Sequence, residues 1–124
     1  MAIRIFLKSP NGSGVVPTAN GAIETEDMTS ITASRTQVYI EFFSDEAGTQ
    51  RVTPTAGTIT IEGSPLGGIF LAPACGGVID ATTVSSPTAT YDVPFFEGRI
   101  IRGKASFSGV TGAAFARVMF WRYD

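Results

Sequence analysis

Hydrophobic and polar residues alternate with a period of two along much of the chain. The clearest case is residues 36–43, where Val38, Ile40 and Phe42 fall on one face. Because successive side chains of a β-strand point to opposite faces, this pattern predicts strands with one face in a core. Seven strands are expected at residues 3–8, 36–43, 58–62, 78–83, 89–95, 99–107 and 113–123, with three shorter candidates at 21–25, 49–53 and 69–71. The count expected for the fold is about eight short strands.

The inward positions of these strands predict which side chains build the core. These positions are Ile5, Val38, Ile40, Phe42, Ile59, Ile61, Ile101, Phe107, Val118 and Phe120. The last strand, 113–123, is apolar on both faces near its end. We therefore expect it to lie in the middle of a sheet or beneath a second subunit.

The composition points to the same fold class. The 124 residues include 11 Ile, 9 Val, 15 Thr and 9 Phe but only 3 Leu, and β-branched and aromatic residues suit pleated, half-buried strands. The 14 Gly and 7 Pro provide frequent turns. The sequence therefore predicts an all-β protein. We expect a single domain over residues 1–124, an antiparallel β-sandwich that is jelly-roll-like or immunoglobulin/fibronectin-like.

The residue types present argue against catalysis. The chain has no His and a single Cys, Cys75, which excludes nucleophile–histidine catalysis, His-ligated zinc and cysteine clusters. Its glycine-rich segments are not followed by Lys-Ser/Thr or by a helical pattern, as a phosphate-binding loop requires. The acidic group Glu24, Glu26 and Asp27 is interpreted as a solvated turn rather than a calcium site. We expect a protein that is not an enzyme and has no cofactor or metal.

The net charge is −2, but the charges are unevenly distributed. Five cations and no acid fall within residues 98–123. They are Arg99, Arg102, Lys104, Arg117 and Arg122. Because five cations are too few for a nucleic-acid footprint, we expect them to face an acidic surface of a partner protein. No apolar run approaches the roughly 20 residues of a membrane span, and the chain begins without a secretory signal pattern, so no membrane partner is expected.

Residues 63–79 contain no charged side chain at all. One interpretation is a buried strand at 69–71 between two glycine loops, and the other is a surface segment that contacts a partner. Together with the two-faced last strand, this segment supplies the candidate interface residues. They are Leu66, Ile69, Phe70, Leu71, Trp121 and Tyr123.

Two stretches carry a resemblance to a known class of protein. The run Phe-Phe-Ser-Asp-Glu-Ala-Gly-Thr at 42–49, followed by Thr-Pro-Thr-Ala-Gly-Thr at 53–58, resembles small virion proteins of tailed bacteriophages. So does Gly-Val-Thr-Gly-Ala at 109–113, which leads into Ala-Arg-Val at 116–118. The resemblance implies a non-enzymatic structural protein in the head decoration, neck or collar, or tail or baseplate. It would be made in the host cytoplasm, reside in the virion, and bind itself and other virion proteins.

A second interpretation is a carbohydrate-binding or adhesion β-sandwich, such as a receptor-binding tip. It predicts an exposed aromatic platform in a groove, formed for example by Tyr39, Trp121 or Tyr123. Trp121 and Tyr123 have the alternative role of packing in the core or an interface.

Overall fold

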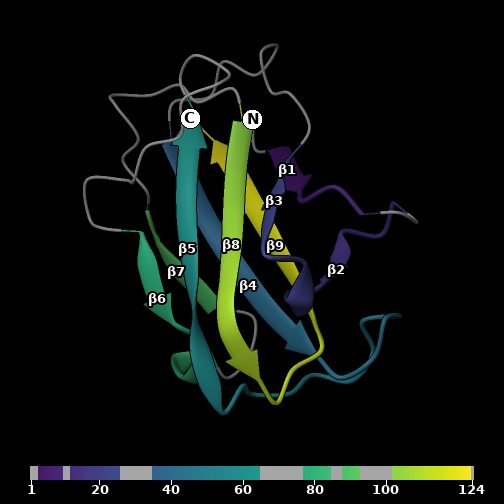
Figure 1. Cartoon of the computed structure of the whole chain (residues 1–124). Helices are drawn as coiled ribbons and strands as arrows, with labels where there is room; N and C mark the ends of the chain where they lie inside the picture. The colour runs from purple at the N-terminus through teal and green to yellow at the C-terminus, as the bar shows by residue number, and fades with distance from the viewer. Residues whose placement is uncertain are drawn as a thin grey trace.

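The computed structural model describes residues 3–9, 12–25, 35–64, 77–84, 88–92 and 102–123. Two antiparallel sheets pack face to face as a β-sandwich, which confirms the predicted fold class (Figure 1). The strands are β1 (Ile3–Phe6), β2 (Val15–Pro17), β3 (Ala22–Glu24), β4 (Arg35–Phe43), β5 (Ala56–Ser64), β6 (Val78–Asp80), β7 (Thr88–Asp92), β8 (Arg102–Thr111) and β9 (Phe115–Tyr123). Two short 3₁₀ helices, η1 (Thr18–Asn20) and η2 (Ala81–Thr83), follow β2 and β6.

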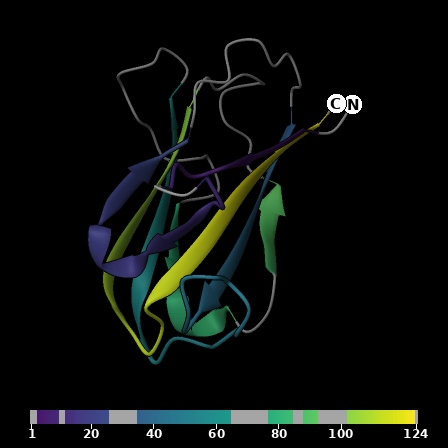
Figure 2. The ribbon, with the colours of Figure 1, turned by 90° about the vertical axis from the view of Figure 1, so that its right-hand side faces the viewer.

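The strand order is that of a jelly roll. One sheet runs β1-β9-β4-β7, with β2 also paired to β9, and the other runs β3-β8-β5-β6. Taking β1 and β2 as one interrupted strand, the first strand pairs with the last and each later strand with its counterpart from the other end. Successive strands alternate between the sheets except within the pair β5 and β6. This nested pairing distinguishes the jelly roll from the immunoglobulin order. Figure 2 shows β5 and β8 in one layer and β4 and β9 in the other.

Four local predictions differ from the structure. The strand expected at 78–83 ends at Asp80, and residues 81–83 form η2 instead. Strand β2 was not expected, and β8 continues to Thr111 where a loop was predicted from residue 108. Residues 49–53 contribute only an isolated bridge, Phe43 to Arg51, instead of a strand. The predicted strand at 69–71 lies outside the described residues. The extension of β8 forms because Thr111 pairs with Ala56 of β5 beyond a bulge, in which Gly109 and Val110 of β8 lie opposite Gly57.

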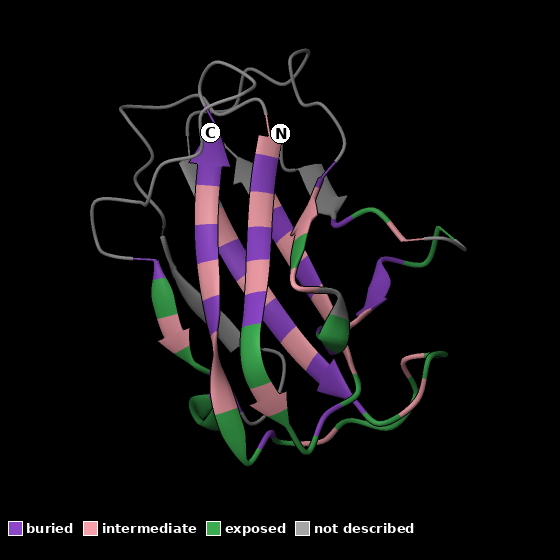
Figure 3. Cartoon of the chain, viewed as in Figure 1, coloured by how far each residue is buried: buried purple, intermediate pink, exposed green. Residues whose placement is uncertain are grey.

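The core lies between the two sheets (Figure 3). The alternation of hydrophobic and polar residues in the sequence predicted most of the side chains that form it. Eight predicted core residues belong to it: Val38, Ile40, Phe42, Ile59, Ile61, Phe107, Val118 and Phe120. The side chains of Ile5 and Ile101 lie outside the described part of the chain. Leu7, Val16 and Ala116 are also buried in it, because β1 and β2 close the side of the sheet beyond β9.

Candidate binding surfaces

The outer face of the β1-β9-β4-β7 sheet carries a row of cross-strand pairs between β4 and β9. These strands are paired over all nine residues of each, and β9 lies between β4 and β1, as expected for a central strand. Since alternate residues point outward, the register places five pairs on this face, and the side chains of four of them are described. Below Arg35 with Tyr123 at the end of β9, these four are Gln37 with Trp121, Tyr39 with Met119, Glu41 with Arg117, and Phe43 with Phe115.

The lower part of this face is covered by residues 44–51, which we call the strap. Its backbone is closed by a hydrogen bond from the Ser44 N–H to the Gln50 carbonyl, 3.0 Å long. Gly48, at φ +70°, lies so close to the sheet that a Cβ there would be 3.1 Å from Val15. Phe43 is consequently only 1% exposed although it points away from the core between the sheets.

Asp45 organises the turn of the strap. Its carboxylate accepts hydrogen bonds from the hydroxyl and the N–H of Thr49 and from the N–H of Gln50. The Thr49 hydroxyl and then the Gln50 N–H stabilise the charged form, which holds the pKa of Asp45 below its usual value. Because the bonds within the strap occupy both carboxylate oxygens, this arrangement is a turn motif rather than a site for a ligand.

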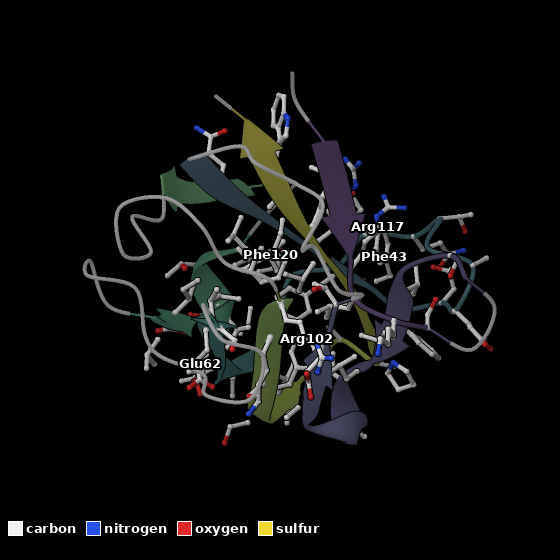
Figure 4. The ribbon with its side chains drawn as sticks, turned by 90° about the horizontal axis from the view of Figure 1, so that it is seen from above. Phe43, Glu62, Arg102, Arg117 and Phe120 are labelled. Atoms are coloured by element: carbon white, nitrogen blue, oxygen red, sulfur yellow. The ribbon has the colours of Figure 1, made fainter. Side chains whose placement is uncertain are left out.

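Glu41 links the strap to the sheet through ion pairs with an arginine of each. Its Oε1 accepts from Arg117 Nε at 2.8 Å, and Arg51 Nη2 of the strap is 3.0 Å from its Oε2. The Glu41 side chain is only 13% exposed. The guanidinium of Arg117 also lies over the Phe43 ring, 5.4 Å from its centroid. Figure 4 shows Arg117 and Phe43 together on one side of β9 and Phe120 on the other.

We expect Glu41→Gln to lower the free energy of unfolding by about 1–3 kcal/mol, because it leaves two guanidinium groups without their shared carboxylate. Urea denaturation followed by circular dichroism measures the loss. Glu46→Gln is the matched control, since Glu46 is an exposed acid of the same strap and its substitution should change stability by less than about 0.5 kcal/mol. Equal stabilities for the two variants would contradict the conclusion that Glu41 holds the strap against the sheet.

The upper part of the face holds an aromatic pair. The ring centroids of Tyr39 and Trp121 are 5.6 Å apart, with the rings inclined by 42°. The Tyr39 hydroxyl donates to Gln37 Oε1 at 3.0 Å. We call Gln37, Tyr39, Met119 and Trp121 the upper platform. Two of the three predicted aromatic residues therefore come together, although both are half-buried rather than fully exposed, and the Tyr123 side chain lies outside the described part.

The outer face of the β3-β8-β5-β6 sheet is polar instead. Thr58, Thr60 and Ser106 lie on it, and its charges are paired across strands. Arg102 is 3.4 Å from Glu24, and Lys104 is 4.0 Å from Glu62. Val78, at the edge, is the one large apolar side chain classed as exposed among the described residues.

The structure separates the cations that the sequence brings together. Arg102 and Lys104 lie on the outside of one sheet, and Arg117 lies on the outside of the other. Each of these three pairs with an acid of this chain. Arg99 and the side chain of Arg122 lie outside the described residues. The described cations therefore form no single patch, and their contact with an acidic partner stays a prediction.

Three connections between strands leave from one end of the sandwich, which we call the connection end. Strands β3, β5 and β7 end there, and the segments that follow them, residues 26–34, 65–76 and 93–101, lead to β4, β6 and β8. The candidate interface residues Leu66, Ile69, Phe70 and Leu71 belong to the second segment and lie outside the described residues. At the opposite end the described connections are folded closely, as in the strap.

A shallow, open depression of about 490 Å³ lies at that opposite end. It is lined mainly by small residues, and the hydroxyl of Thr18 in its wall already donates to the Ala113 carbonyl at 2.8 Å. The other hydroxyl of the lining is that of Ser44, and the lining residues include no ionisable side chain. In the part of the chain that the structure describes, no three His, Cys, Asp or Glu side chains gather as a metal site.

Comparisons with family models, curated proteins and solved structures find no match for this chain. None of the helices in the described ranges is sufficiently long and apolar to span a bilayer.

Proposed function

We propose that this protein is a non-enzymatic structural component of a tailed-bacteriophage particle, and that it binds copies of itself and neighbouring virion proteins through the connection end. The observation that carries the proposal is the topology. It attaches residues 65–76, the greater part of the uncharged stretch, to the same end of a rigid sandwich as 26–34 and 93–101. Segments carried by a rigid scaffold are where β-sandwiches usually bind partners.

The fold is compatible with this role. Jelly rolls occur in viral capsid domains and in lectins, and a fold by itself does not determine function. The resemblance of residues 42–49, 53–58 and 109–113 to phage virion proteins favours the first of these. The lack of His in the whole chain also removes the commonest catalytic base.

The chemistry of residues 65–76 supports association. The segment contains Leu66, Ile69, Phe70 and Leu71 and no charge. Apolar side chains grouped at a protein surface favour association because burying one of them contributes about 1.5–3 kcal/mol. A contact repeated around a ring or lattice would add these contributions at every interface.

We expect Leu66→Asp or Phe70→Asp to dissociate the assembly while the fold stays intact. A buried carboxylate in an apolar interface loses its hydration without gaining a partner. Light scattering measures the mass of the assembly, and circular dichroism measures the β-sheet content of each variant. Ala47→Asp is the matched control, because it adds the same charge to the exposed strap at the opposite end.

Loss of assembly in the first two variants, with Ala47→Asp unaffected, supports the proposal. Loss of the fold itself would mean that these side chains belong to the core, and the interface would then have to be sought elsewhere. An unchanged assembly in all three variants would contradict association through residues 65–76.

A further inference from the structure

The upper platform combines flat aromatic surface with hydrogen-bonding groups. Tyr39 and Trp121 contribute the rings, and Gln37 lies directly across from Trp121 in the β4–β9 register. We propose that the upper platform binds a neutral saccharide, with one sugar ring lying against Tyr39 and Trp121. This site is separate from the connection segments on which the proposed assembly depends.

The apolar side of the site suits a sugar ring. A gluco-configured pyranose has its hydroxyls around the rim and C–H bonds on both faces, so an aromatic ring is its natural apolar contact. Trp121 is half-buried, and its indole nitrogen belongs to the buried part. The surface that it offers to a ligand is therefore ring carbon, which favours stacking over hydrogen bonding.

The polar groups of the site suit the hydroxyl groups around the rim of the same sugar ring. The Tyr39 hydroxyl donates to Gln37 Oε1, which leaves the Gln37 amide nitrogen as a donor and the phenol oxygen as an acceptor. Below them the planar Glu41–Arg117 pair borders the platform, with N–O distances of 2.7–2.8 Å. A few fixed polar groups around an apolar surface are typical of small-molecule sites.

Charge and size suit a neutral sugar better than an anion. Arg117 is paired with Glu41. The register places one further cation, Arg4, beside Trp121 and one further acid, Asp92, on the other side of the platform, so these two charges and the Glu41–Arg117 pair sum to zero. The platform covers two rows of two adjacent strands, about 7 Å by 5 Å between Cα positions, which is the scale of a single sugar ring.

The site is also rigid before any ligand binds. Its side chains project from two nine-residue strands that are paired along their whole length, and the Tyr39–Gln37 hydrogen bond fixes two of them. A preorganised site loses less conformational entropy when a ligand binds.

Trp121 is the only tryptophan of the chain, so tryptophan emission reports on this site alone. We expect a titration of the full chain with cellohexaose to change that emission in a saturable way. Tyr39→Ala should weaken the binding about tenfold or more, because it removes one of the two aromatic rings of the platform. Gln37→Leu removes the amide while leaving both rings and should also weaken it.

Thr60→Ala, on the outside of the opposite sheet, is the matched control and should bind as the wild type does. Near-ultraviolet circular dichroism verifies that each variant is folded. Two results would overturn the proposal: no saturable change in emission for the folded wild type, or equal affinity for the wild type and both platform variants. If Tyr39→Ala does not fold, Gln37→Leu alone decides the second result.

Discussion

Replacing Phe120 with alanine is expected to lower the free energy of unfolding by about 3–5 kcal/mol. Phe120 is fully buried between the two sheets, and it packs against β8 at Gly103. Both sheets are held in place by their own ladders, so they cannot collapse fully into the space that the ring leaves. Urea denaturation followed by circular dichroism measures the loss.

Phe115→Ala is the matched control for this prediction. It removes the same side chain from the same strand, but from the outer face, where Phe115 is half-buried. We expect it to cost about 1–2 kcal/mol. If the two variants lost equal stability, or Phe115→Ala lost more, the inward face of β9 would be assigned wrongly by one residue.

Adding one methyl group at Gly103 is expected to destabilise the protein by about 1–3 kcal/mol. A Cβ at this position would stand 2.6–2.8 Å from three carbons of the Phe120 ring. Strand β8 cannot move away to make room, because Gly103 is paired with Gly63 of β5 and its N–H donates to the Thr25 hydroxyl at 3.0 Å. Denaturation of Gly103→Ala measures the effect.

The cause of this loss is tested by a double-mutant cycle. Phe120→Leu shortens the side chain that the new methyl group meets. The double variant Gly103→Ala/Phe120→Leu should therefore lose less stability than the sum of its two single variants. Strictly additive losses would show that the contact between the methyl group and the ring is not the reason that position 103 is glycine.

The sequence predicted the core well because the core obeys a local rule. Val38, Ile40 and Phe42 alternate with less buried residues, and the structure buries all three. Strand β2 was missed because Val-Val-Pro is too short to show a period. Its partner in the sheet is β9, which is far away in the sequence. The end of β8 was missed because Ser-Gly-Val-Thr is typical of a turn. In the structure Gly109 and Val110 form a bulge, and Thr111 beyond it pairs with Ala56 of β5, a strand that is far away in the sequence.

The candidate site shows the same division between local and long-range information. Tyr39 and Trp121 could be selected from the sequence as aromatic residues on outward faces. Gln37 and the Glu41–Arg117 pair could not, because they join the site only through the register of β4 with β9. Cations that are neighbours in sequence were dispersed for a related reason: β8 and β9 are consecutive strands but belong to opposite sheets.

We propose that this chain works by associating with copies of itself and with other proteins. The mass of the wild-type protein in solution tests this proposal, measured by light scattering during size-exclusion chromatography over a range of concentrations. We expect a species whose mass is a multiple of the 13.0 kDa chain and which Leu66→Asp reduces to the monomer. A mass of 13.0 kDa at every concentration, for a folded protein, would contradict it.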